Sequence, residues 1–199
     1  MITITNLKRI AIAAILIALT GCVSVTKVDS GDRAVGERLQ LHLDGAWNQI
    51  NAPSVVGPNC QSWTMEGLTV DQILVYSGLK NDEPIHYQAG GSSEKKVFKF
   101  HSNMQPEQIV ALYEGMLTRD GSTFTLKKLE PAMFGGVKGF HFEYTLVRKT
   151  DNVQISGTGS GAVSKGELFA IVYQAPQLVF YPRHQARVAH IIQSARLKA

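Results

Sequence analysis

Long hydrophobic stretches are scarce in this sequence. The clearest uncharged apolar run, from Ile10 to Leu19, is about ten residues long, whereas a membrane-spanning helix needs roughly 20. The run therefore predicts no lasting transmembrane helix, and its position at the N-terminus needs another explanation.

An excess of charge of one sign is also lacking. The chain holds 20 basic and 16 acidic residues, and two of the basic residues, Lys8 and Arg9, precede the apolar run. The remainder is almost balanced. Because nucleic-acid-binding domains concentrate basic residues on one face, this composition argues against nucleic acid as a partner.

The common catalytic and metal-binding motifs are missing as well. There is no His-Glu-x-x-His zinc motif and no Cys-x-x-Cys pair. A nucleophile elbow needs Gly-x-Ser-x-Gly, whereas Ser160 lies in the segment TGSGA, residues 158–162. These absences predict a protein that is not an enzyme, with no catalytic residue, resident metal or cofactor.

The N-terminus has the features of a secretory signal. Lys8 and Arg9 form a positive flank, the apolar run follows, and small residues lead to Cys22. The residues Leu19-Thr20-Gly21-Cys22 resemble the lipobox of bacterial prolipoproteins. The resemblance implies that the thiol of Cys22 receives a diacylglyceryl group, that cleavage follows Gly21, and that the new amine is acylated. The alternative is an ordinary secreted protein with an unmodified cysteine.

The lipobox resemblance also predicts a location. Two or three acyl chains hold a protein stably on a membrane, whereas one chain is marginal. In enterobacterial lipoproteins an Asp after the lipidated cysteine implies retention in the inner membrane, and this chain has Val23 there. We therefore expect the periplasmic face of the outer membrane, with the inner membrane as the alternative.

The chain divides into three parts. Residues 1–21 are the predicted signal peptide, residues 22–33 the lipidated cysteine and a polar, unpatterned tether, and residues 34–199 a single globular domain. If Cys22 is lipidated, Cys60 has no partner for a disulfide within the chain. We expect Cys60 to be buried, as free cysteines usually are, with a reactive thiol as the alternative.

Two hydrophobic periodicities alternate within the domain. Alternating apolar residues predict strands at 39–43, 122–129, 137–147, 153–163 and 167–173, a hairpin formed by 61–65 and 70–76, and a short strand at 96–100. Helical spacing predicts a helix from Pro106 to Leu117 and a final helix from about Pro182. Residues 167–173 are apolar on both faces, which indicates a central strand covered on both sides. The predicted class is α+β: a mainly antiparallel sheet flanked by helices, an α/β/α sandwich.

Gly157, Gly159 and Gly161 alternate within a predicted strand. A phosphate-binding loop would need a helix N-terminus directly after the glycines, and none is evident. A hairpin folded about residues 150–151 would instead place aromatic rings over the glycines. The predicted pairs are Leu146 with Ile155, Tyr144 with Gly157, Phe142 with Gly159, and Phe140 with Gly161.

Other polar residues show weaker patterns. His141 and Glu143 share one face of a strand and could join a metal site, although an exposed sheet face is the simpler interpretation. His184 and His190 lie too far apart on the final helix to be adjacent ligands. Three carboxylates in turn-rich segments have no evident partner: Asp71, Asp82 and Glu83.

The final helix contains the candidate interaction residues. A basic stripe is expected to face solvent, with anionic lipid, cell-wall polymer or an acidic partner as the alternative contact; it consists of Arg183, Arg187, His190 and Lys198. Phe180 and Tyr181, together with Arg183 and Arg187, have the aromatic and arginine composition of interface hot spots, unless both rings cap the core. The polar, glycine-containing loop 81–93 is a second candidate surface.

The folded part resembles the PsbP-like group. The stretches that match are Gly139–Tyr144, Leu168–Tyr173 and Ile191–Ala195, within a similar order of strands and helices. The resemblance implies an antiparallel sheet sandwiched between helices. It also implies adaptor or assembly roles, with no active site common to the group.

Together these features predict a membrane-anchored periplasmic lipoprotein. We expect a non-catalytic binding or assembly module of the cell envelope, whose partner is an envelope protein or the cell wall. An envelope hydrolase or metal-dependent enzyme is the alternative, and it requires a concave pocket with clustered His and carboxylate groups near His141 and Glu143. A small-ligand carrier is a third hypothesis, which an apolar pocket would favour.

Overall fold

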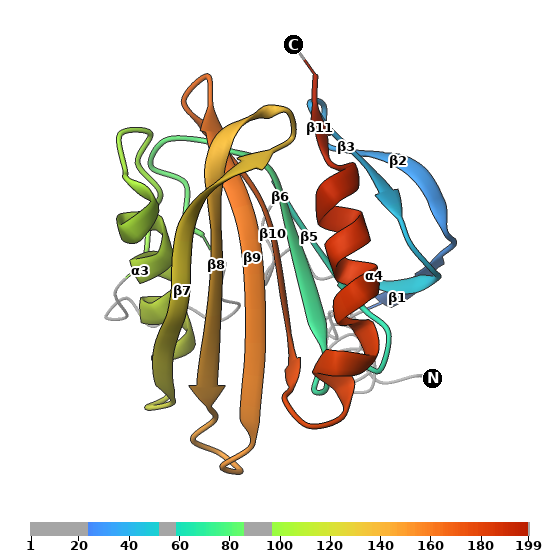
Figure 1. The fold of residues 1–199 in the computed structure, drawn as a ribbon, viewed down its shortest axis with the longest axis vertical. Helices are drawn as coiled ribbons and strands as arrows, with labels where there is room; N and C mark the ends of the chain where they lie inside the picture. The colour runs from blue at the N-terminus through green and yellow to red at the C-terminus, as the bar shows by residue number, and fades with distance from the viewer. Residues whose placement is uncertain (1–23, 52–58, 86–96, 199) are drawn as a thin grey trace, which may run out of the picture.

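A computed structural model describes residues 24–51, 59–85 and 97–198 (Figure 1). The predicted signal peptide, the lipidation of Cys22 and residues 86–93 of the candidate loop lie outside the described residues. Within the part that is described, no helix has the length and apolar character needed to cross a membrane.

The strands form two antiparallel sheets. The larger sheet has eight strands in the order β1–β4–β5–β6–β10–β9–β8–β7, and the smaller has three in the order β11–β3–β2. The larger sheet contains β1 (Ser24–Val28), β4 (Trp47–Asn51), β5 (Cys60–Thr64), β6 (Gln72–Leu79), β7 (Thr123–Phe134), β8 (Val137–Val147), β9 (Gln154–Ser164) and β10 (Glu167–Pro176). The smaller sheet contains β2 (Gly31–Val35), β3 (Leu39–Leu43) and β11 (Arg196–Leu197).

Helices cover both faces of the larger sheet. Helix α3 (Pro106–Leu117) packs on one face, while α4 (Phe180–Ser194) and the small sheet pack on the other (Figure 1). Strand β10 lies between β6 and β9, with Ala170 in the core on the α3 side and Ile171 in the core on the α4 side. The predicted α+β sandwich in one domain and the predicted central strand are both confirmed.

Helix α3 has the predicted boundaries. Pro106 occupies its first turn, and the Gln105 backbone N–H donates to Gln108 Oε1 at 2.8 Å, which satisfies a donor that the helix leaves open. The residues at helical spacing form one buried face: Ile109, Val110, Leu112 and Tyr113.

The β8–β9 hairpin has the predicted register. Tyr144 pairs with Gly157 and Phe142 with Gly159, and the other two predicted pairs are also present. A Cβ atom at Gly157 would overlap the Tyr144 ring, and one at Gly159 would overlap the Phe142 ring. At Gly161 the nearest atoms belong instead to the neighbouring strand β10. The glycines therefore let the rings lie directly on the sheet.

The predicted tether is wrong for most of its length. Strand β1 pairs with β4, and β2 pairs with β3, so residues 24–28 and 31–35 belong to the two sheets. Only Val28 of β1 and Val35 of β2 are buried. Because both are edge strands that bury one side chain each, their polar composition resembles that of a linker.

Two other predictions differ from the structure. The predicted strand at 96–100 is reduced, among its described residues, to an isolated bridge between Lys99 and Pro84. Strand β7 extends beyond the predicted 122–129 to Phe134 and includes Pro131. Proline is tolerated there because β7 is an edge strand, where an N–H can face solvent instead of a partner.

Replacing Gly159 with Ala tests the packing of rings over glycines. The added methyl group would displace the Phe142 ring, so we expect a loss of about 1–3 kcal/mol in the free energy of unfolding. Gln154→Ala, at an exposed position of the same strand, should change it by less than about 0.5 kcal/mol. Urea unfolding measures both, and equal values for the two variants would contradict the packing.

Candidate functional site

Helix α4 presents three faces with different chemistry. One face enters the core through His184, Val188 and Ile191. A second contacts the turns beside β3 and β5, and a third borders a groove on the open part of the sheet. Side chains three and four positions apart share a helix face, so each face is a regular stripe along α4.

The second face is the predicted basic stripe, and it forms a polar seam. Arg183 Nη1 lies 3.0 Å from Glu66 Oε1, and His190 Nδ1 lies 3.2 Å from Asp44 Oδ2. Arg187 Nε is 3.8 Å from the same Asp44 carboxylate. The stripe is solvent-exposed, as expected, because the side chains of Arg183, Arg187 and His190 are 50%, 37% and 68% exposed, and each also lies near a carboxylate of this chain.

The fourth predicted member of the stripe, Lys198, lies beyond the end of α4. Its backbone N–H donates to the Arg38 carbonyl at 2.8 Å. The last member of the seam on α4 is Ser194, four residues after His190, and its hydroxyl accepts a hydrogen bond from the His42 N–H at 2.8 Å.

The turn between β5 and β6 is organised by a buried carboxylate. Asp71 is 1% exposed and accepts hydrogen bonds from the Thr64 hydroxyl and from the backbone N–H groups of Met65 and Glu66. The Thr64 hydroxyl in turn accepts from the Gly67 N–H at 2.8 Å. Asp71 has no evident partner in the sequence, yet in the structure it fixes the turn that presents Glu66 to α4.

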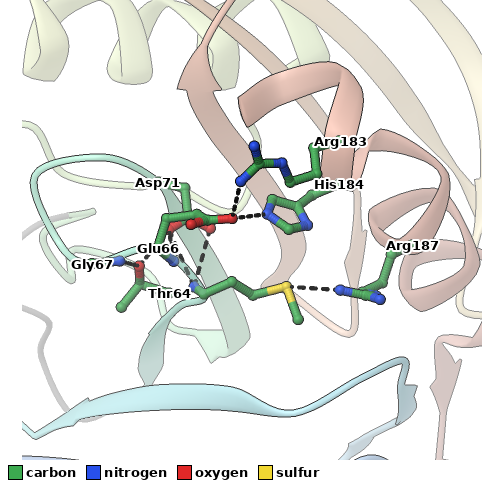
Figure 2. A network of polar contacts seen from close by, with 8 residues as sticks. Thr64, Glu66, Gly67, Asp71, Arg183, His184 and Arg187 are labelled. Atoms are coloured by element: carbon green, nitrogen blue, oxygen red, sulfur yellow. Dashed lines mark hydrogen bonds and ion pairs between the residues drawn. The ribbon is translucent and has the colours of Figure 1, made fainter. Parts of the chain in front are cut away.

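Glu66 joins this turn to the first turn of α4. Figure 2 shows Arg183 and His184 both directed at the Glu66 carboxylate, with His184 Nε2 at 2.8 Å. Hydrogen bonds from His184 and Arg183 lower the pKa of Glu66. The His184 ring is buried, and its Nδ1 has no hydrogen-bond partner among the described residues.

The predicted interaction residues lie together at the start of α4, but they are engaged within the chain. Phe180 and Tyr181 are half-buried against the core, and the Tyr181 ring stacks on Tyr173 at 5.9 Å between ring centroids. The Arg183 guanidinium lies over the Phe180 ring at 5.1 Å, and Arg187 Nη1 donates to Met65 Sδ at 3.1 Å. Both aromatics thus cap the core.

The remaining polar candidates have local partners. Asp82 lies 3.2 Å from His101 Nδ1, and Glu83 Oε2 accepts from Asn59 Nδ2 at 2.8 Å. Cys60 is a buried free cysteine, as expected, and burial raises the pKa of its thiol.

The third face of α4 borders a groove of about 350 Å³. Helix α4 lies against β10 and β9 of the larger sheet, while β7 and β8 lie beside it (Figure 1). From α4 the groove is lined by Tyr181, Gln185, Ala189, Ile192 and Gln193. From the sheet it is lined by Glu130, Ala132, His141, Glu143, Thr158 and Ser160.

His141 is the centre of a hydrogen-bonded array in this groove. The β8–β9 register places His141 opposite Ser160, and Glu143 lies on the same face two residues further along β8. The Nδ1 atom of His141 is 2.9 Å from Ser160 Oγ, and its Nε2 atom is 3.2 Å from Glu143 Oε1. The array therefore connects a hydroxyl, an imidazole and a carboxylate across two strands.

This array has the composition of a nucleophilic site but lacks other parts of one. Ser160 is only 4% exposed, and it lies in the middle of β9, where the strands on both sides are hydrogen-bonded. The ladders consume the nearby backbone N–H groups that an oxyanion hole would need. No group of three or more His, Cys, Asp and Glu suited to a metal occurs in the described part of the chain. The geometry is better suited to hydrogen bonding with a ligand.

Sequence reasoning placed His141 and Glu143 on one strand face and identified Tyr181 on the final helix, but it did not bring Tyr181 to the other two. It missed Ser160 and Gln185 as neighbours of these residues. The sheet side of the groove could have been predicted from two features. Thr158 and Ser160 alternate with glycines, and the predicted register places them beside residues of the neighbouring strand.

Comparisons with known proteins bear on the fold. No family model and no curated protein sequence matches the chain. The solution structure of cyanobacterial PsbP (CyanoP) from Synechocystis sp. PCC 6803 is similar at a TM-score of 0.57 and 11% identity, covering 90% of this chain and 96% of that one. The chain thus has the PsbP-like fold that its sequence resembles.

Two other solved structures are more distant. The Ran-binding protein Mog1p of Saccharomyces cerevisiae has a TM-score of 0.44 and 9% identity over 88% of this chain and 96% of its own. LpqN, involved in cell envelope biogenesis of Mycobacterium tuberculosis, has a TM-score of 0.35 and 12% identity over 99% and 98%. At these scores neither structure adds to the functional argument.

The Glu66 contacts predict a pH-dependent stability. Because the folded-state pKa of Glu66 is lowered below its ordinary value of about 4.3, its stabilising contribution is present above that value. The contribution is lost as the pH falls through the lowered pKa. The difference in unfolding free energy between wild type and Glu66→Gln should therefore shrink from about pH 7 to about pH 3.

Urea unfolding of both proteins across this range provides the measurement. Gln185→Ala, an uncharged change on the same helix, is the control, and its difference from wild type should not vary with pH. A Glu66→Gln difference that stayed constant over the whole range would show that the ionised carboxylate does not hold α4.

Proposed function

We propose that this protein is a membrane-anchored, non-catalytic binding module of the cell envelope, which holds a cell-wall glycan in the groove beside α4. The observation that carries the proposal is the groove itself, with the array of His141, Ser160 and Glu143 on its floor. The predicted lipid on Cys22 supports it, because it would hold such a site close to a membrane.

The groove's chemistry favours a polyhydroxyl ligand. Amide groups both donate and accept hydrogen bonds, and carboxylates accept them, so together they match the donors and acceptors of sugar hydroxyls. The accessible groups of this kind are Glu143 on the sheet and Gln185 and Gln193 on α4, while the Tyr181 ring provides an apolar wall. A small number of placed polar groups beside an apolar surface is the usual construction of a ligand site.

The charges in the groove favour an uncharged ligand. Glu130 Oε1 lies 2.9 Å from Lys128 Nζ, and the Glu143 carboxylate faces His141. Each carboxylate therefore has a cationic or hydrogen-bonding neighbour within the sheet. A strongly basic or acidic partner would find little complementary charge here, whereas neutral sugar units need only hydrogen bonds.

Matched tryptophan substitutions on α4 test the groove. Ala189 lines the groove, whereas Ala186 is exposed on another side of the same helix. Ala189→Trp should obstruct the site and weaken binding of the full chain to purified peptidoglycan sacculi at least about tenfold, a loss of about 1.4 kcal/mol. Ala186→Trp should bind as wild type does.

Co-sedimentation with sacculi measures this binding, and circular dichroism checks that both variants are folded. Equal binding by the two variants would reject the groove as the glycan site.

The hydrolase alternative is tested separately, with a fluorophosphonate probe that labels nucleophilic serines. Labelling of wild type that disappears in Ser160→Ala would show that Ser160 is a nucleophile and would overturn the non-catalytic assignment.

The two cysteines provide a matched test of the anchor. Cells grown with an alkyne-bearing palmitate should label the wild-type chain and Cys60→Ser, because Cys60 is buried in the fold. Cys22→Ser should lose the label, since the lipidated thiol is removed. Label retained in Cys22→Ser, read by in-gel fluorescence, would contradict anchoring through Cys22.

A further inference from the structure

A second cavity lies on the opposite face of the sheet from the groove. It has a volume of about 330 Å³ and lies between the end of α3 and strands β6, β8 and β10. Leu74, Leu146 and Val172 form its wall on the sheet, while Met116 and Leu117 contribute from α3. This volume is at the small end of the roughly 300–1,000 Å³ typical of ligand sites.

The cavity exists because α3 ends before the strands beneath it do. The buried residues of the helix lie between Ile109 and Tyr113, whereas Met116 and Leu117 at its end are half-buried. Strand β8 continues to Val147, so its last inward residue, Leu146, extends the apolar surface past the helix. Aliphatic side chains thus line a space that the helix does not close.

Two glutamines bring polar groups into the same cavity. Gln72 of β6 and Gln174 of β10 are directly opposite each other in the sheet. The Tyr144 hydroxyl donates to Gln174 Oε1 at 3.0 Å, and Gln72 Nε2 donates to Ser62 Oγ at 2.9 Å. Within the described residues this leaves Gln174 Nε2 as a donor and Gln72 Oε1 as an acceptor for a ligand.

The charges around the cavity are balanced. Arg119, Asp120 and Arg148 contribute to its lining, and the Arg148 guanidinium pairs with Asp151 through Nη2 and Oδ2 at 2.6 Å. The two arginines are thus matched in number by two carboxylates, Asp120 in the lining and Asp151 beside it. A charged ligand would therefore meet no excess of opposite charge in the cavity. An uncharged polar head would lose little hydration free energy on entering it.

We propose that this cavity binds a small neutral amphiphile, whose hydrocarbon body lies against Leu74, Leu146 and Val172 and whose head hydrogen-bonds to Gln72 and Gln174. The site is separate from the groove beside α4 and does not depend on the proposed glycan binding. Burial raises the pKa of Tyr144, so its hydroxyl remains a donor that orients Gln174.

Photo-crosslinking in membranes tests the proposal on the full, anchored chain. The probe is a short-chain monoacylglycerol with a diazirine in its acyl chain, and a fatty acid with the same chain is the charged comparison. The monoacylglycerol should label peptides that contain Met116, Leu117 or Leu146, as located by mass spectrometry. The fatty acid should label them at least about fivefold less, equivalent to about 1 kcal/mol.

Two variants and a matched control make the result specific. Met116→Trp fills the cavity and should abolish the labelling, whereas Met133→Trp, at a 66%-exposed position on β7, should leave it unchanged. Gln174→Leu removes the head contact without filling the cavity and should reduce the labelling. Circular dichroism checks that each variant is folded.

Several outcomes would overturn the proposal. No labelling of these peptides, or equal labelling in Met116→Trp and wild type, would reject the cavity as the site. Stronger labelling by the fatty acid would reject a neutral head. If Met116→Trp did not fold, unchanged labelling in folded Gln174→Leu would still exclude the assigned head contact.

Discussion

Strand β10 imposes the constraint on which the rest of the fold depends. Phe169, Ile171 and Tyr173 point to one side and Ala170 and Val172 to the other, and all five are buried. Each large apolar side chain gains about 1.5–3 kcal/mol from burial, so both faces of the sheet need a cover. Helix α3 covers one and α4 with the small sheet covers the other. Neither cover is complete, and both candidate ligand sites lie where a cover ends.

Strand β9 explains why the two faces beside β10 have such different chemistry. On the α3 side its glycines accept the rings of Phe142 and Tyr144, which makes that face thick and apolar. On the α4 side the alternate positions are Thr158 and Ser160, which are small and polar. Because successive strand residues point to opposite faces, one segment of sequence provides both an aromatic core and a polar floor. The glycines that resemble a phosphate loop are therefore a packing device, and the residues between them define the groove.

The sequence predicted those parts of the fold that depend on local pattern. The β8–β9 register followed from pairing large rings with glycines, and α3 followed from Pro106 and helical spacing. The polar seam was not predictable, because Glu66 and Arg183 are distant in sequence and nothing local indicates that they meet. Strands β1 and β2 were misinterpreted because an exposed edge strand and a linker share a polar composition. The sequence predicted His141 and Glu143 on one strand face and Tyr181 on the final helix, but not the groove between them, since its geometry depends on where α4 crosses the sheet.

The position of α4 thus determines the shape of the groove. Two kinds of interaction fix that position, apolar burial and the polar seam. Burial of Val188 and Ile191 supplies most of the docking energy, because the seam's ion pairs are partly exposed and each contributes at most about 1 kcal/mol. Apolar contacts are not directional, however, and by themselves would let the helix rotate or slide. The Glu66 carboxylate, held in place through the Asp71 turn, gives Arg183 and His184 one fixed partner. The seam therefore sets the rotation of α4 about its axis, and with it the side chains that α4 directs into the groove on its other side.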